Sequence, residues 1–167
     1  MQRPRRSRGF DIVLALCLIA ACVVAVRHLA VRSAKAPEAD SGLTWTRLEP
    51  AATVEVADTD ATRQHGLMER DSLDADHGMY FTYDKDQRGG FWMRNTTIAL
   101  SIAFVRDDGV IIDIKDMVPL DETTVGPDVP YRDALEMNRG WFKRNGIMIG
   151  DRAVLEAGKV SFWRRSL

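Results

Sequence analysis

Trp92, Arg94 and Asn95 are the residues of this sequence whose types and spacing best suit contact with a ligand. An indole beside a guanidinium can stack on a planar group and hydrogen-bond an anionic one. The same residues also permit a structural role, in which Trp92 covers the core, Arg94 pairs with an acid and Asn95 makes a turn through its side chain. Both interpretations stay open, and the turn chemistry of asparagine favours the structural role.

A second group of polar residues would supply acid–base chemistry if folding brought its members together. It consists of Arg70, His77 and Glu136, joined by Arg94. Meeting in one cleft, these side chains would suit a hydrolase or transferase. The sequence offers them no nucleophile, because it has no G-x-S-x-G motif and both cysteines fall within the first 22 residues. We therefore assign no catalytic residue and keep these side chains as ligand-binding candidates.

Two histidines, His65 and His77, are the starting point for any metal site, with Glu69, Asp76 or Glu136 as partners. No H-x-H or H-E-x-x-H spacing occurs, and isolated histidines are usually structural. Thioethers bind Cu(I), but the methionines after the leader are scattered singly, as core-filling methionines are. We therefore predict neither a metal nor a cofactor.

The first 36 residues have the composition of a membrane-targeting segment. Four arginines precede residue 9, and the run from Ile12 to Val26 carries no charge. As a helix this run spans roughly 22 Å, less than the roughly 30 Å hydrocarbon core, unless it extends to Val31. Three fates stay open: an uncleaved anchor, a cleaved signal peptide, or a lipoprotein modified at Cys22. Each predicts that the domain which follows lies outside the cytoplasm, in the periplasm, and an anchor would make the chain a single-pass membrane protein.

Charge is divided unevenly along the chain. Of its 23 basic and 24 acidic residues, 7 and 1 lie in residues 1–36, which leaves 16 and 23, a net charge of −7, on the remainder. Nucleic-acid binding requires a cationic surface that displaces phosphate counterions. We therefore predict no nucleic-acid partner.

The positioning elements begin after the leader. Residues 37–48 are expected to form a solvated linker and an edge strand, and residues 49–167 one β-rich domain. The strongest strand pattern covers residues 89–105, where apolar residues alternate with small ones on a second apolar face. We expect two strands here, joined at Asn95-Thr96-Thr97, buried on both sides and central in the sheet.

Local signals predict two helices and a hairpin. Asp58-Thr59-Asp60 and Gly66 mark the start and end of a helix over Asp60–His65. Asn138 is expected to cap a second helix over Arg139–Arg144. Arg106–Gly109 predicts a type I′ turn.

The other expected strands are short. They are Ala52–Val56, Gly78–Tyr83, Val110–Met117 with Val110, Ile112 and Ile114 inward, Arg132–Met137, Arg152–Leu155 and Lys159–Trp163. Asp84 to Gly90 is expected to be a turn. Seven or eight strands with two short helices predict a mainly β fold, a small closed or half-closed β-barrel-like domain behind an N-terminal apolar helix, because closure removes exposed edges.

Five ordered motifs between Thr53 and Leu155 carry a family resemblance. They are Val54–Thr59, Gly66–Arg70, Gly78–Phe81, Phe91–Thr96, and Asn145–Ile147 with Gly150-Asp151. The chain is similar to the prokaryotic domain-of-unknown-function family numbered 192, an uncharacterised conserved membrane protein group. The resemblance implies a β-rich single domain, often behind a signal or anchor, with no agreed activity or cofactor. The family often has a proline and an acid after the Asn-Thr corner, where this chain has Ala99 and Ser101.

These observations predict a membrane-tethered, extracytoplasmic binding or accessory module of the cell envelope. Its partners would be the membrane, through the N-terminal helix, and a small ligand or an envelope protein. The alternatives are the envelope hydrolase or transferase described above and a purely structural partner of another envelope protein.

Overall fold

The computed structural model describes residues 44–166, so the predicted membrane segment lies outside the described residues. The elements in chain order are β1 (Trp45–Ala57), α2 (Asp60–His65), β2 (His77–Gln87), β3 (Leu100–Val105), β4 (Ile111–Met117), β5 (Tyr131–Asn138), α3 (Trp141–Arg144), β6 (Arg152–Glu156) and β7 (Lys159–Arg165).

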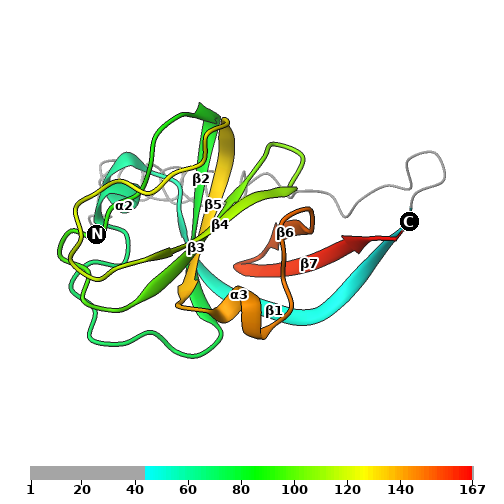
Figure 1. Cartoon of the computed structure of the whole chain (residues 1–167), viewed down its shortest axis with the longest axis horizontal. Coiled ribbons are helices and arrows are strands. Elements are labelled where there is room, and N and C mark those ends of the chain that lie inside the picture. Colours follow the sequence, from blue (N-terminus) through cyan, green and yellow to red (C-terminus); the bar gives the residue numbers. More distant parts are fainter. Residues whose placement is uncertain (1–43, 167) are drawn as a thin grey trace, which may run out of the picture. The chain divides into compact units, whose positions relative to one another are not determined.

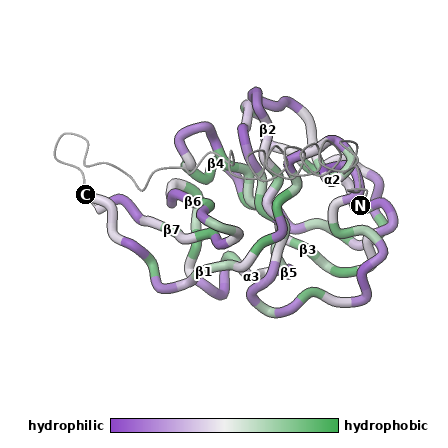
Figure 2. Tube along the Cα trace, turned by 180° about the vertical axis from the view of Figure 1, so that it is seen from behind, coloured by the Kyte–Doolittle hydropathy of each residue, from purple (hydrophilic) through white to green (hydrophobic). Residues whose placement is uncertain are grey.

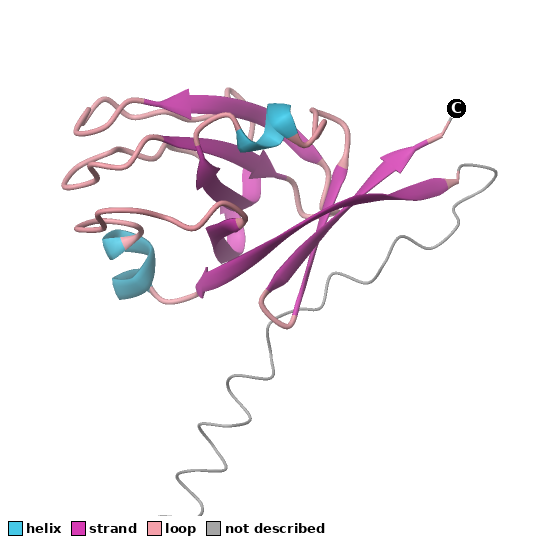
Figure 3. Ribbon diagram, turned by 90° about the horizontal axis from the view of Figure 1, so that it is seen from below, coloured by secondary structure: helices cyan, strands magenta, loops and turns pink. Residues whose placement is uncertain are grey.

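All seven strands belong to one sheet, in the order β4-β3-β5-β2-β1-β7-β6. β1 and β2 run parallel, and the other neighbouring pairs run antiparallel. The sheet curls into a half-barrel (Figure 1), which confirms the predicted mainly β fold with two short helices. The long loops gather with α2 at one end of this half-barrel (Figure 3).

The core follows from the apolar faces of the strands. Hydrophobic residues concentrate along the strands and hydrophilic ones along the outer loops (Figure 2). One buried cluster is built around Phe81 of β2, Phe104 of β3 and Tyr131 of β5, and the rings of the last two lie 5.0 Å apart. A second group of rings joins Trp141 of α3 to Phe162 of β7, 5.6 Å away. Aromatic pairs in such edge-to-face or tilted arrangements add to the stabilisation from burial.

Two strands are longer than the sequence pattern indicates. The expected edge strand near Trp45 and the strand Ala52–Val56 are parts of one 13-residue strand, β1, because β7 pairs along it. The pairing shifts between Arg47 and Ala51, next to Pro50, which has no N–H to donate to a ladder. β2 continues to Gln87, where a turn was expected, because Gln87 still pairs with Tyr131.

The prediction of two strands within residues 89–105 is wrong in its first half. Phe91 makes one isolated bridge, to Val125, and the next strand begins only at Leu100. The segment between them bonds to the loop after β4 instead of to a strand: the Met93 N–H donates to the Asp121 carbonyl at 2.8 Å. The predicted burial on both sides holds for all six residues of β3. The predicted central position is wrong, because β2 is the middle strand and β3 lies between β4 and β5.

The hairpin at Arg106–Gly109 forms, but its predicted turn type is wrong. The Gly109 N–H donates to the Arg106 carbonyl at 2.9 Å, and Gly109, with φ of 84°, is the one residue of this turn at positive φ. A type I′ turn needs two such residues.

The burial of β4 differs in part from the predicted pattern. The register of β3 with β4 shifts between Phe104 and Val105. Ile111 is fully buried, whereas Val110, Ile112 and Ile114 are half-buried, and Ile112 packs against the core as predicted.

The first helix forms as predicted over Asp60–His65, with Thr59 as its N-cap and Gly66 after its end. The second is shorter than predicted and is not capped by Asn138. Asn138 is the last residue of β5, and its amide donates to the carbonyls of Leu73 and Asp74, at 3.1 and 2.8 Å. Gly140, in a left-handed conformation, precedes α3 instead.

Candidate functional site

A cleft of about 290 Å³ opens beside α2 and contains a buried carboxyl group. Its walls come from the end of α2, from β2 and from the segment after Gly90, and its floor includes Glu136 of β5. The sheet brings these parts together, because β5 pairs with β2 on one side and with β3 on the other.

Glu136 occupies a position where an apolar residue is expected. Its backbone partners are Met79 on β2 and Ile102 on β3, both buried members of the core. Glu136 is only 4% exposed, and none of residues 44–166 hydrogen-bonds its carboxyl group. Burial disfavours the charged form and raises the pKa of Glu136 to about 8. At neutral pH this carboxyl is therefore mostly protonated.

Aromatic rings form much of the cleft wall. Phe81 and Phe91 meet edge-to-face at 4.9 Å, and Tyr83 and Trp92 also line the cleft. Burial is the main cause that raises the pKa of Tyr83, and the nearby Glu136 carboxyl adds to the rise. The Tyr83 phenol therefore stays neutral and can donate or accept a hydrogen bond beside the carboxyl.

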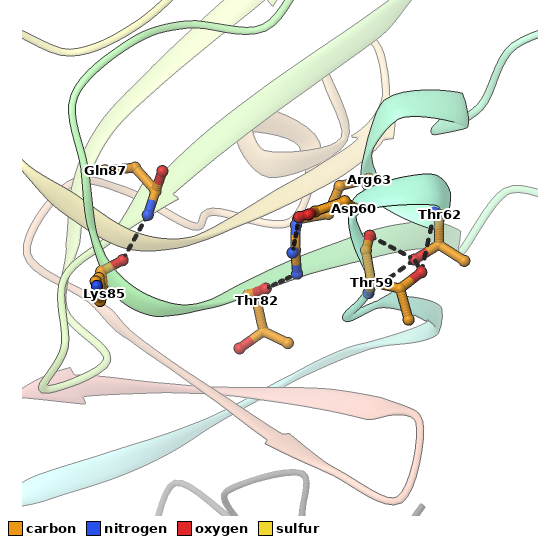
Figure 4. Close-up of polar contacts among 7 residues, drawn as sticks. All are labelled: Thr59, Asp60, Thr62, Arg63, Thr82, Lys85 and Gln87. Atoms are coloured by element: carbon orange, nitrogen blue, oxygen red, sulfur yellow. Dashed lines mark hydrogen bonds and ion pairs between the residues drawn. The ribbon is translucent and has the colours of Figure 1, made fainter.

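The helix that forms one wall is held by local polar contacts, drawn in Figure 4. Thr59 and Thr62 make a reciprocal capping box: the Thr62 N–H donates to Thr59 Oγ1 at 3.1 Å, and the Thr59 N–H donates to Thr62 Oγ1 at 3.0 Å. Arg63 donates from Nη1 to the Thr82 carbonyl at 2.8 Å and pairs with Asp60, as Figure 4 shows. The bond from Arg63 to the Thr82 carbonyl ties α2 to β2, and the capping box holds the first turn of α2.

The segment after Gly90 is fixed by its backbone. Asn95 and Glu69 both have positive φ angles, 52° and 62°. The Glu69 N–H donates a hydrogen bond to the Asn95 carbonyl at 2.9 Å. The Leu120 N–H, at φ 63°, donates to the Thr96 carbonyl at 3.1 Å. Three of the four non-glycine residues at positive φ within residues 44–166 thus meet at this rim. Backbone conformations of this kind persist where the surroundings enforce them, and they gather at functional sites.

Gly90 shows how closely the rim is packed. A Cβ there would lie 2.7 Å from the Val125 carbonyl oxygen, so a larger residue would push the two segments apart. The backbone of Phe91 bonds Val125 in both directions at 2.8 and 2.7 Å.

Trp92, Arg94 and Asn95 line a second, more open hollow that adjoins the cleft. The Trp92 side chain is 40% exposed and lines both hollows. The Arg94 guanidinium lies 5.7 Å from the centre of the Trp92 ring. The structure therefore places the three predicted ligand-binding residues together on the rim, with Asn95 also making the turn.

Arg70 and His77 do not line the cleft. Arg70 donates to both carboxylate oxygens of Glu55, at 2.6 and 2.9 Å, and this pair lowers the pKa of Glu55. His77 is half-exposed at the start of β2, with Nδ1 3.7 Å from Asp74. Of the four residues on which the alternative hydrolase or transferase depends, only Glu136 lies in the cleft, and Arg94 lies on its outer rim.

Several residues of the cleft were not singled out from the sequence. They include Tyr83, Phe91, Met68, Thr96 and Thr124. Glu136 is recognisable as unusual, because it is a glutamate within a strand whose paired neighbours are apolar. Such a residue is either buried at a cost or faces a cavity. The others carried none, because each is an ordinary residue of a strand, turn or loop.

No group of three or more His, Cys, Asp or Glu side chains within residues 44–166 is arranged to hold a metal ion. Asp76, considered with the histidines, accepts a hydrogen bond from the Trp141 indole at 2.9 Å. His65 lines the cleft mouth, apart from His77. Neither of the two helices that the structure describes is long and apolar enough to cross a membrane.

A family model matches residues 43–155, about two thirds of the chain, which include every described strand except β7 and the last residue of β6. The chain belongs to the DUF192 family. The family is described as an uncharacterized ACR, so membership fixes the fold and leaves the activity open. Among curated proteins, none matches this chain.

Two solved structures share the DUF192 fold seen here. A protein of unknown function from Novosphingobium aromaticivorans is 36% identical, with a TM-score of 0.60, over 65% of this chain and 81% of its own. A Sinorhizobium meliloti protein described as a "putative transcription regulator" is 32% identical, with a TM-score of 0.58, over 70% of this chain and 95% of its own.

Proposed function

We propose that this chain is a ligand-binding module of the cell envelope, which holds a small molecule in the cleft above Glu136. The observation that carries the proposal is the buried Glu136 carboxyl, which lines a cleft and lacks a hydrogen-bond partner within residues 44–166. Burial disfavours the charged form of this carboxyl. Its oxygens are open to a donor from a ligand in the cleft.

The surroundings of Glu136 also suit binding. Pockets for small molecules combine apolar walls with a few placed polar groups. Phe81, Phe91 and Trp92 supply the walls, and Glu136 and Tyr83 supply polar groups near the floor. A catalytic role for this cleft has less support, because Arg70 and His77 lie elsewhere.

The location of the module is part of the proposal. The arginine-led apolar segment of residues 1–36 supports tethering to the membrane with the DUF192 domain outside the cytoplasm. A net charge of −7 after residue 36 opposes binding to DNA phosphates.

Ligand capture tests the cleft. The full chain in detergent is equilibrated with a small-molecule extract of bacterial envelopes, recovered by ultrafiltration and analysed by mass spectrometry. Gln64, at the mouth of the cleft, is changed to tryptophan to narrow the entrance, and Lys85→Trp, an exposed change outside the cleft, is the matched control. We expect a compound that the wild type and Lys85→Trp retain and Gln64→Trp does not. Equal retention by all three proteins, or retention of nothing, overturns the proposed binding function.

Topology tests the location. A reporter that is active only outside the cytoplasm, fused after Leu167, should be active and should sediment with membranes after alkaline washing. An inactive reporter would contradict the extracytoplasmic location, and release by washing would contradict the anchor.

A protein partner is the second candidate, favoured by the exposed indole of Trp92 beside Arg94. A pull-down from detergent-solubilised envelope compares the wild type with the double variant Trp92→Ala, Arg94→Ala. A partner lost only with the double variant supports this role, and identical partner sets exclude it.

A further inference from the structure

We propose that the ligand of this cleft carries an ammonium or guanidinium group, which binds the Glu136 carboxylate while the aromatic rings of the wall surround it. This inference rests on the proposed binding function and names the chemistry of its ligand. Four features of the described residues support it.

The first is the need for donors. A carboxylate has only acceptor oxygens, and none of residues 44–166 donates to those of Glu136. A cationic N–H group supplies both the donors and the charge that favours the ionised form of Glu136, and such charge-assisted bonds are the strongest available to a carboxylate. A neutral donor would leave the carboxyl mostly protonated at neutral pH.

The second is the aromatic wall. Cations bind favourably over the faces of tryptophan, tyrosine and phenylalanine rings. Two cations of the protein already do so at this site: the Arg63 guanidinium lies 4.8 Å from the Tyr83 ring centre, and that of Arg94 lies 5.7 Å from the Trp92 ring centre. Phe91, beside Phe81, adds a further ring to the lining.

The third is the state of the one arginine that lines the cleft. Arg63 would repel a cationic ligand if its charge were free. Its Nη2 lies 2.5 Å from Asp60 Oδ1, and its Nη1 donates to the Thr82 carbonyl. Arg63 is therefore paired with Asp60 of its own helix, and no contact between Arg63 and the Glu136 carboxyl occurs within residues 44–166.

The fourth is the electrostatic field of the domain. The net charge of −7 after residue 36 attracts cations to the surface and repels anions. An anionic ligand would be repelled by this field and would oppose the ionisation of Glu136. The observations therefore favour a cation over a phosphate or carboxylate ligand.

Binding of a cation should also release a proton. The carboxyl is mostly protonated at neutral pH, and a cation favours its ionised form. The other groups that face the cleft are Arg63 and His65 from α2 and Tyr83 from β2, whereas β3 contributes the uncharged Ile102 beside Glu136. A ligand of constant charge isolates the titration of Glu136 from that of the ligand.

The test uses two probes of nearly the same shape, benzylguanidinium and its neutral counterpart benzylurea. Both have N–H donors and a phenyl ring, and only the first carries a charge between pH 6 and pH 9. Each is titrated into the full chain, and the dissociation constant is taken from the chemical shifts of the tryptophan indole N–H signals. The proteins are the wild type, Glu136→Gln, and Glu55→Gln, which removes the same charge from an exposed position.

We expect the wild type to bind benzylguanidinium at least about tenfold more tightly than benzylurea at pH 8, and this preference to grow about tenfold or more from pH 6 to pH 9. Glu136→Gln should lose both effects, whereas Glu55→Gln should keep them. Unchanged amide spectra check that the variants are folded.

Equal affinity for the two probes, a preference that survives in Glu136→Gln, or binding of neither probe overturns the cationic ligand. Stronger binding of benzylurea indicates a neutral ligand and also overturns it. The binding function itself is judged by ligand capture from envelope extract, so the two proposals can fail separately.

Discussion

Glu136 and Asp151 are carboxyl groups buried to nearly the same extent, 4% and 2% exposed, in opposite surroundings. Asp151 accepts from Arg164 through both oxygens, at 2.8 and 2.7 Å, and from the Met148 N–H at 2.9 Å. Glu136 accepts from no residue between 44 and 166. A buried charge with a full set of donors holds the fold together, whereas one without donors is kept for a ligand or carried at a cost.

The partners of Asp151 explain the motif that ends the family resemblance. Arg164 also donates to the Gly146 carbonyl at 2.6 Å, and the pairing with Asp151 raises the pKa of Arg164. The turn around Asn145-Gly146 and the Gly150-Asp151 corner are thereby attached to β7. Glu136 lies in a strand with no equivalent clamp on its side chain.

The largest expected effect comes from breaking the paired carboxyl. Asp151→Ala removes both carboxylate acceptors of the Arg164 guanidinium and the acceptor of the Met148 N–H, leaves Arg164 only its bond to the Gly146 carbonyl, and should lower the free energy of unfolding by about 3–5 kcal/mol. Urea unfolding measures it. Asp86→Ala, which breaks the exposed pair with Arg132, should cost about 1 kcal/mol or less. Similar losses from both changes would remove the contrast between a clamped and an exposed carboxyl.

The unpaired carboxyl should make stability depend on pH in the opposite sense to a salt-bridged acid. Its pKa is about 8 in the folded protein and 4.5 ordinarily, so between these values the folded state binds the extra proton. The contribution is fully present below pH 4.5 and is lost as pH rises through 8. Wild type should therefore lose on the order of 3 kcal/mol, relative to Glu136→Gln, between pH 5 and pH 9. Urea unfolding at several pH values measures this difference, and parallel curves for the two proteins would show that burial does not perturb Glu136.

Helix capping allows a smaller test of the cleft wall. Thr59→Ala removes the side-chain oxygen that accepts from the Thr62 N–H and should destabilise the protein by about 1 kcal/mol. Because α2 forms the wall, the same change should weaken ligand capture as well as stability. Denaturant unfolding and the capture assay together measure it. Loss of stability with unchanged capture would mean that the cleft does not depend on the order of α2.

The smallest expected effect is at a residue predicted for the site and found outside it. Arg70→Ala breaks a largely exposed pair with Glu55 and should cost about 0.5–1 kcal/mol. Capture of the ligand should be unchanged, measured by the same ultrafiltration assay. If Arg70→Ala lost as much binding as Gln64→Trp does, Arg70 would have to be part of the binding site.

Predictions from local signals succeeded where a short range of interactions decides the outcome. The cap at Thr59, the end of α2 at Gly66 and the hairpin at Gly109 depend on residues a few positions apart. The prediction of a strand over Phe91–Arg94 was wrong, because an alternating apolar pattern does not show whether a partner strand is available. The loop after β4 supplies that partner through Asp121 and Val125, roughly 30 residues away.

The sequence by itself determined the class of fold, the family, the strand pattern of β3 and the polar group of residues worth following. Alternation, turn residues and charge act over short distances along the chain, so the sequence contains them directly. Only the tertiary structure decided that Glu136 faces a cleft with Trp92 while Arg70 and His77 do not. That outcome depends on the sheet order, which sets β5 between β2 and β3, and on the donors that each carboxyl meets across the fold.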